Sequence, residues 1–145
     1  MKPVPLPKLI ATITTALEPR SEILEAYLFG SRARRSQDSI ADVDVAVYLD
    51  PAAPAPHGFG YEAELSATLG TAVPGSTVDI LVLNHAPPLL YHRVLRDGVR
   101  LLARRLQETT TREGEALSRY CDYVPQLRKI AAAQDARIAR GRFGR

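Results

Sequence analysis

Three aspartates are the residues of this 145-residue chain whose type and spacing best suit chemistry. Asp42 and Asp44 stand two positions apart, so on a strand both side chains leave the same face. Asp79 stands near the start of a second apolar segment, TVDILVL. If the two strands are neighbours, the three carboxylates converge at one edge and repel one another unless a cation offsets their charge. Oxygen ligands of this kind on a rigid sheet suit Mg²⁺ or Mn²⁺.

A glycine–serine pair is the second feature that suits a reaction site. Gly30 and Ser31 stand where the apolar segment ILEAYLF ends and a polar segment begins, which favours one helical turn after Ser31. Glycine lets a backbone approach a phosphate closely, and a helix N-terminus offers free N–H groups to an anion. Together with the carboxylates, the pair predicts a phosphate cradle beside a metal site, because a metal ion would bridge the two.

Alternating strand and helix patterns position these residues. Short apolar runs bounded by Gly, Pro or polar residues predict strands, and apolar residues at helical spacing predict helices. The predicted strands are 23–29, 42–49, 77–83 and 99–103, and the predicted helices are 6–17, 61–70, 87–96 and a final one at the C-terminus. This order indicates an α/β fold, a small mixed sheet flanked by helices, with a C-terminal helix.

The final helix carries its own signals. Thr110 and Glu113 have the spacing of a capping box, and Pro125 predicts a kink. Its apolar stripe, which we expect to pack in the core, consists of Leu117, Tyr120, Cys121, Val124 and Ala131. Residues 103–145 carry 10 Lys and Arg against 5 Asp and Glu. A basic tail is compatible with a nucleic-acid partner, but a solvated helix face is the favoured interpretation, so we expect no direct nucleic-acid binding.

Length and composition set the remaining bounds. A chain of 145 residues, 46% of them hydrophobic, predicts a single domain over 1–145. Cys121 is the one cysteine, which excludes a disulfide scaffold and suits a reducing cytosol. No run of 18 apolar residues occurs, so the sequence predicts no membrane span, and we expect a cytoplasmic protein.

The spaced motif carries a family resemblance. Gly30-Ser31, followed after ten residues by Asp42-Val43-Asp44, resembles the signature of the DNA polymerase beta nucleotidyltransferase superfamily, with Asp79 in the place of its third carboxylate. The segments FGSRAR, DVDVAVYL, TVDILVLN and APPLLYHRVLRDGVRLL more closely resemble the minimal nucleotidyltransferase (MNT) antitoxins, which are encoded beside HEPN-domain toxins. The resemblance covers residues 22–103 as a nucleotidyltransferase core, which leaves 107–138 as a C-terminal helical extension.

The resemblance implies an activity, a partner and a metal. It implies an antitoxin that transfers AMP from ATP to a tyrosine of a HEPN ribonuclease toxin by two-metal catalysis. Asp42 and Asp44 would hold two Mg²⁺ ions, with Mn²⁺ as an alternative. Asp79 would complete the site of the ion that activates the acceptor hydroxyl.

The resemblance also implies how the nucleotide is held. Gly30 and Ser31 would bind the triphosphate, and Arg32 or Arg34 would neutralise charge on the departing pyrophosphate. The sequence departs from many relatives at Arg35, where they have Gly, and at Ala41, where they have Ser.

Two other functions stay open at the level of sequence. In the first, the protein neutralises its partner by complex formation alone. The intact carboxylate triad argues against this reading, and Ala41 argues weakly for it. In the second, the acceptor is a small molecule of the aminoglycoside type, against which the short chain argues, because a dedicated acceptor pocket usually needs more protein.

Overall fold

The structure is a computed structural model that describes residues 4–30, 33, 42–53 and 60–141. Four strands and four α-helices follow one another in these residues, with one short 3₁₀ turn, η1. Their bounds are α1 Leu6–Leu17, β1 Ile23–Phe29, β2 Val43–Leu49, α2 Tyr61–Ala72, β3 Val78–Val82, η1 Leu83–His85, α3 Pro88–Asp97, β4 Val99–Ala103 and α4 Leu106–Ala139.

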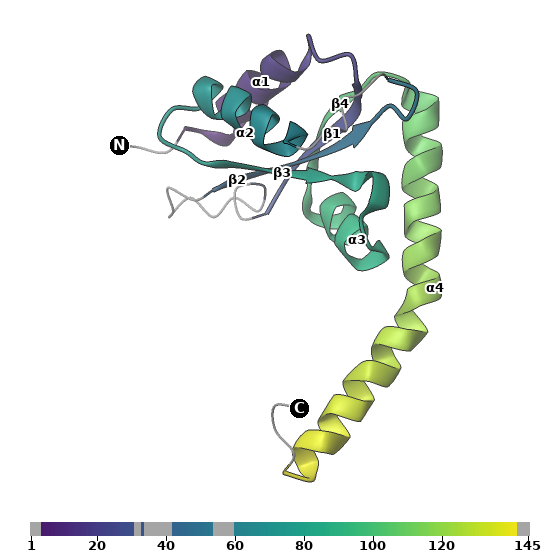
Figure 1. Cartoon of the computed structure of the whole chain (residues 1–145). Coiled ribbons are helices and arrows are strands. Elements are labelled where there is room, and N and C mark those ends of the chain that lie inside the picture. The colour runs from purple at the N-terminus through teal and green to yellow at the C-terminus, as the bar shows by residue number, and fades with distance from the viewer. Residues whose placement is uncertain (1–3, 31–32, 34–41, 54–59, 142–145) are drawn as a thin grey trace.

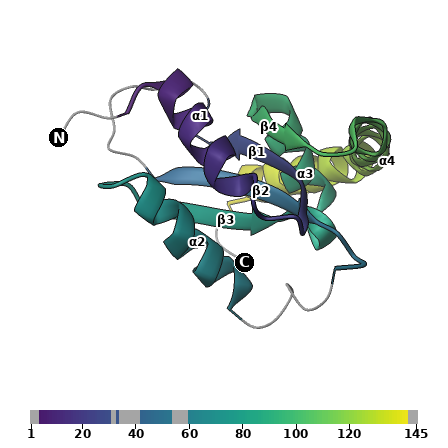
Figure 2. The same ribbon diagram turned by 90° about the horizontal axis from the view of Figure 1, so that it is seen from above.

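The strands form one mixed sheet in the order β3-β2-β1-β4 (Figure 2). β1 pairs antiparallel with both β2 and β4, whereas β2 and β3 run parallel. A parallel pair needs a crossover connection, and the segment containing α2 supplies it. Because β2 and β3 are parallel neighbours, they begin at the same edge of the sheet.

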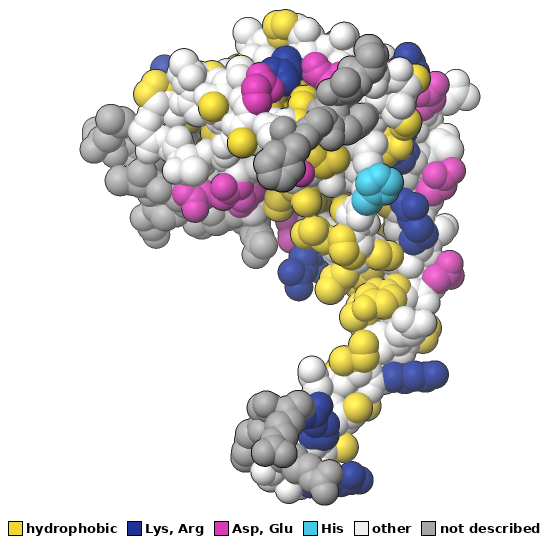
Figure 3. Space-filling model, viewed as in Figure 1, with side chains coloured by type: hydrophobic (Ala, Val, Ile, Leu, Met, Phe, Trp, Pro, Cys, Tyr) yellow, Lys and Arg dark blue, Asp and Glu magenta, His cyan; other side chains and the backbone are white. Residues whose placement is uncertain are grey.

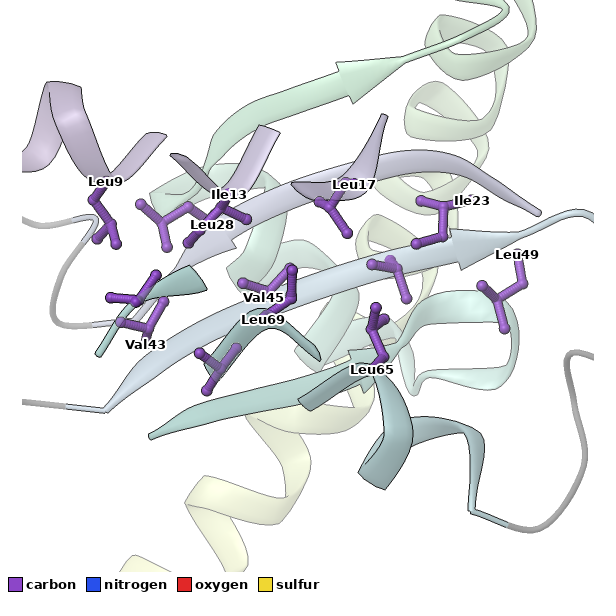
Figure 4. Close-up of a cluster of buried hydrophobic side chains, with 14 residues drawn as sticks. Leu9, Ile13, Leu17, Ile23, Leu28, Val43, Val45, Leu49, Leu65 and Leu69 are labelled. Atoms are coloured by element: carbon purple, nitrogen blue, oxygen red, sulfur yellow. The ribbon is translucent and has the colours of Figure 1, made fainter. Parts of the chain in front are cut away.

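Helices α1 and α2 cover one face of the sheet (Figure 1). Their apolar residues pack on alternate strand residues, as the two-residue period of a strand requires. Figure 4 shows these buried side chains meeting between helices and sheet. The labelled members are Leu9, Ile13, Leu17, Ile23, Leu28, Val43, Val45, Leu49, Leu65 and Leu69.

Helix α3 and the beginning of α4 cover the opposite face (Figure 1). The buried cluster on this face is smaller and consists of Tyr27, Ala46, Leu83, Tyr91, Val94 and Ala116. Only the first part of α4 takes part in this packing, since Thr109 and Ala116 are its buried residues. The helix then bends and projects away from the sheet (Figure 1), and Pro125 lies inside it.

The sequence predicted this architecture and most element boundaries. The strands 23–29 and 99–103 are confirmed residue for residue, and α1 spans the apolar stripe from Leu6 to Leu17 that predicted it. The strand predicted over 77–83 is one residue shorter at each end, and Leu83 begins η1. The helical turn expected after Ser31 lies outside the described residues.

The helix predicted to end at Gly70 continues to Ala72. This glycine does not adopt the left-handed backbone conformation with which glycine ends helices, so its backbone does not interrupt the hydrogen bonding of α2.

Two expectations for α4 were wrong. The helix begins at Leu106, so Thr110 lies inside it and its hydroxyl donates a hydrogen bond to the Gln107 carbonyl instead of capping the helix. The predicted apolar stripe enters the core only in part, since Leu117 is 50% exposed and Cys121 is exposed, whereas Tyr120 stacks on His92 of α3. The buried residues of α4 are Thr109 and Ala116, in its first turns. Among the described residues, no helix is long and apolar enough to cross a membrane.

Candidate active site

The three predicted carboxylates lie at one edge of the sheet. Asp44 and Asp79 are the second residues of β2 and β3, and the parallel pairing sets them directly beside each other. Asp42 precedes β2 by one residue. The sequence-based expectation that the two strands are neighbours is therefore confirmed, and the register brings the acidic residues together.

The strand period decides which face of the sheet carries these carboxylates. Val43 and Val45 belong to the core under α1 and α2, so Asp44 between them points to the opposite face, as Ala46 does. In β3 the same alternation places Asp79 opposite to Val78. The carboxylates therefore lie on the face covered by α3 and α4.

Burial and neighbouring negative charges disfavour the ionised form of Asp44 at this edge. Burial raises the pKa of Asp44, and the negative charges of Asp79 and Asp42 raise it further. Asp42 and Asp79 are exposed, whereas Asp44 is half-buried. Among the described residues, no three acidic, histidine or cysteine side chains close around one point. The carboxylates share an edge with unbalanced negative charge, and their donor set consists of oxygen atoms, which fits a hard divalent cation.

Gly30 lies against this edge, at the end of β1. Its φ is +77°, a left-handed conformation that favours glycine. A Cβ at this position would collide with the carboxylate of Asp44. The absence of a side chain therefore does two things here: it permits the turn, and it leaves room for the Asp44 carboxylate beside the backbone.

Replacing Gly30 by valine tests this arrangement. The new side chain displaces the Asp44 carboxylate and occupies the space where a phosphate would approach the backbone, so we expect the affinity for a nucleotide to fall at least about tenfold. Calorimetry with Mg²⁺ and a non-hydrolysable ATP analogue measures it. Gly60→Val is the matched control, because Gly60 also has a positive φ, +100°, but a Cβ there meets nothing within 4 Å. Undiminished affinity in Gly30→Val would place the nucleotide elsewhere.

The remaining predicted site residues are not placed. Ser31, Arg32 and Arg34 lie outside the described residues, as do Arg35 and Ala41, at which the sequence departs from many relatives. Their suggested roles in binding the triphosphate and neutralising the pyrophosphate stay predictions.

A pocket of about 910 Å³ lies at the other end of the same strands. It is lined by residues from the C-terminal ends of β2 and β3 and from the start of α2, among them Tyr48, Tyr61 and Asn84. The carboxylates stand at the opposite, N-terminal ends of β2 and β3. The pocket and the carboxylates therefore lie at opposite ends of β2 and β3.

Sequence reasoning missed the ion pair that fastens α4 to the sheet. Glu25 is fully buried in β1, and Arg112 of α4 donates a hydrogen bond of 2.5 Å to its Oε1. The Arg112 guanidinium also lies over the Tyr48 ring, 3.9 Å from its centroid. A charged residue inside the apolar run ILEAYLF was the available signal, since a buried carboxylate requires a partner.

Comparisons with known proteins relate this chain to a family of nucleotidyltransferases and to solved toxin–antitoxin structures. The family described as polymerase beta, nucleotidyltransferase matches residues 11–107. A chain of a toxin–antitoxin crystal structure with AMP-PNP is 25% identical, with a TM-score of 0.66, over 88% of this chain and 97% of that chain. A chain of the tri-AMPylated Shewanella oneidensis HEPN toxin in complex with MNT antitoxin is 23% identical, with a TM-score of 0.65, over 90% and 98% of the two chains. No protein of curated function gives a significant match.

Proposed function

Because the chain belongs to the polymerase beta nucleotidyltransferase family and is therefore a nucleotidyltransferase, we propose that it transfers AMP from ATP to a tyrosine of a HEPN ribonuclease toxin. The protein would act in the cytoplasm as the antitoxin of that toxin. The observation that carries the proposal is the pairing of Asp44 with Asp79 next to Gly30, whose backbone has a left-handed conformation.

The carboxylate edge would hold the metal. Asp42 and Asp44 would bind two Mg²⁺ ions, and Asp79 would complete the site nearer the acceptor. Burial and the negative charges of Asp79 and Asp42 raise the pKa of Asp44, and a bound cation would offset that charge, which supports this assignment. When bound, such ions offset the charge of the triphosphate and of the leaving pyrophosphate.

The residues after β1 would hold the nucleotide. Gly30 lets the backbone approach the triphosphate, and Ser31 would contribute its N–H and hydroxyl to the same phosphates. Arg32 or Arg34 would pair with the pyrophosphate as it leaves. During transfer a bond forms between the acceptor oxygen and the α-phosphorus, the bond from that phosphorus to pyrophosphate breaks, and the acceptor hydroxyl gives its proton to solvent water.

A protein is the acceptor that this chain fits best. The pocket near Tyr48 and Tyr61 lies at the wrong end of the strands for a small-molecule acceptor. A partner that brings its own tyrosine hydroxyl to the carboxylate edge needs no such pocket. AMP attached to a tyrosine near the toxin's ribonuclease residues adds charge and bulk, which obstruct RNA.

The relatives support this acceptor. The relative at 25% identity belongs to a toxin–antitoxin structure that contains AMP-PNP, an ATP analogue. The fold also occurs in the complex of MNT antitoxin with a tri-AMPylated HEPN toxin.

Labelled ATP tests the acceptor class. We incubate the protein with Mg²⁺, ATP carrying a label on its α-phosphate, and either the HEPN-domain protein encoded by the adjacent gene or an aminoglycoside. We expect the label in the HEPN protein and none in the aminoglycoside. Label in the aminoglycoside alone, or the absence of a HEPN gene beside this one, would favour the small-molecule function instead.

A further inference from the structure

The side of α4 that packs on the sheet and on α3 continues along the part of the helix that projects beyond them, and we call the sheet with its packed helices the body of the protein. Within the body this side packs through Thr109, Glu113, Ala116 and Tyr120, which are spaced by four, three and four residues. Glu113 accepts a hydrogen bond of 3.0 Å from the Tyr27 hydroxyl, and the Tyr120 ring stacks on that of His92 of α3, with centroids 3.6 Å apart.

The same spacing continues beyond the last of these contacts. It leads to Tyr123, Leu127 and Ile130, which we call the outer seam. Ile130 is 50% exposed, and every residue from 128 to 139 is exposed. Figure 3 shows hydrophobic side chains gathered along α3 and α4 on the side of the hollow beneath the sheet.

A projecting helix of this kind needs a partner for its stability. Most helical stability in proteins comes from packing an amphipathic face, and Pro125 removes a backbone hydrogen bond in the middle of α4. Along the outer seam Tyr123 and Leu127 are half-buried and Ile130 is exposed, so the described residues of this chain cover the apolar surface of the seam only in part. The projecting part of α4 therefore has the character of a docking element.

Charge indicates which occupant fits. Residues 118–141 contain five basic and two acidic residues. The basic residues are Arg119, Arg128, Lys129, Arg137 and Arg140, and the acidic residues are Asp122 and Asp135. A second copy of the chain would bring the same excess of positive charge and would be repelled. A different protein, with an apolar surface rimmed by Asp and Glu, complements the seam in both respects.

The position of the seam relative to the active site gives it a role. The carboxylates lie on the sheet face covered by α3 and α4, and α4 projects beyond that same face (Figure 1). A protein seated on the seam therefore lies on the carboxylate side of the sheet. The related chain at 25% identity matches 88% of this chain, and the unmatched remainder is shorter than the 34 residues of α4. At least part of α4 therefore has a counterpart in that toxin–antitoxin structure.

We propose that the outer seam of α4 is the docking surface for the HEPN toxin, and that docking there presents the toxin's acceptor hydroxyl to the carboxylate edge. The identity of this partner rests on the proposed function. The chemistry of its surface, apolar with an acidic rim, rests on the seam itself.

A double variant tests the docking surface. Leu127→Glu with Ile130→Glu places two negative charges on the seam and keeps good helix formers. We expect the affinity for the purified HEPN protein encoded by the adjacent gene, measured by calorimetry, to fall at least about 30-fold. The control is Ala132→Glu with Ala136→Glu, which adds the same charges to the opposite side of α4 and should keep the affinity.

Two further readouts separate this proposal from the proposed function. Binding of Mg²⁺ and a non-hydrolysable ATP analogue should be unchanged in both variants. AMP transfer by the seam variant should recover at high toxin concentration, because KM rises while kcat is kept. If the wild type transfers no AMP but the seam variant still loses toxin affinity, docking stands and the proposed reaction fails.

Two results would overturn the docking proposal. One is wild-type toxin affinity in the seam variant, and the other is an equal loss of affinity in the control. If the seam variant keeps toxin affinity but loses dimerisation of the chain or affinity for RNA, the seam is assigned to a second copy or to nucleic acid.

Discussion

Replacing Asp44 by asparagine is expected to reduce nucleotidyl transfer at least about a thousandfold, or ~4 kcal/mol in transition-state stabilisation. The substitution keeps the shape of the side chain and removes the charge at the centre of the carboxylate edge. The same change should leave the thermal unfolding midpoint equal or higher, because burial and repulsion by Asp79 and Asp42 already disfavour the Asp44 charge. Labelled-ATP incorporation and differential scanning calorimetry measure the two effects.

The matched control is Asp50→Asn, because Asp50 lies just after the C-terminal end of β2, away from the carboxylate edge. The Asp50 side chain accepts a hydrogen bond from the Ala52 backbone N–H, a contact that asparagine can keep. We expect this variant to transfer AMP at the wild-type rate. Transfer retained in both Asp44→Asn and Asp42→Asn would remove the carboxylate edge from the reaction.

Replacing Arg112 by methionine is expected to destabilise the fold by about 3–5 kcal/mol at pH 7. The fully buried Glu25 carboxyl would lose the partner of its negative charge, and the guanidinium would no longer cover the Tyr48 ring. Urea unfolding measures the free energy of unfolding. Arg105→Met is the control, because Arg105 forms an exposed pair of 3.5 Å with Glu108 and should cost less than about 1 kcal/mol.

The pH dependence of this loss identifies its cause. Burial raises the pKa of Glu25 above its ordinary value of 4.5, and the Arg112 charge opposes that rise. A raised pKa means that the folded state keeps the Glu25 proton to higher pH than the unfolded chain, so stability falls as the pH rises from 4.5 through the folded-state pKa. Without Arg112 the pKa of Glu25 rises further.

The deficit of Arg112→Met relative to wild type should therefore be largest at pH 7 and shrink as the pH falls toward 4.5. Adding Glu25→Gln to the same variant should remove most of this pH dependence. A deficit that is the same at pH 5 and pH 7 would assign it to lost packing rather than to the buried charge.

Residue types at fixed spacing made the carboxylate edge predictable. Asp42 and Asp44 interrupt a β-branched run at an interval of two, and Asp79 has the same place in a second run, so the period of a strand alone predicts a shared face. The parallel register that sets Asp44 beside Asp79 depends on the strand order, which no single segment encodes. The two runs alone therefore predict a shared face for Asp42 and Asp44, whereas the contact with Asp79 follows from the strand order.

Packing that depends on distant partners was not predictable from local patterns. The stripe of α4 has core-like composition, yet Leu117 and Cys121 are exposed, because the helix turns Ala116 and Tyr120 toward the sheet and α3 and these two residues toward solvent. Capping-box spacing at Thr110 was equally misleading, since the same residue types occur inside helices. Glu25 and Arg112 are 87 positions apart in the sequence, and hydrophobic periodicity within a segment does not predict contacts between distant segments.

The intact mass and the ribonuclease activity of the toxin, measured after the two proteins have been separated, test covalent neutralisation most directly. The toxin is incubated with this protein, ATP and Mg²⁺, purified away from it, and assayed on RNA. Covalent neutralisation predicts a mass increase by one or more AMP units on a tyrosine, with ribonuclease activity still absent after separation. Unchanged mass with activity restored on separation would contradict it and would leave complex formation as the means by which the antitoxin acts.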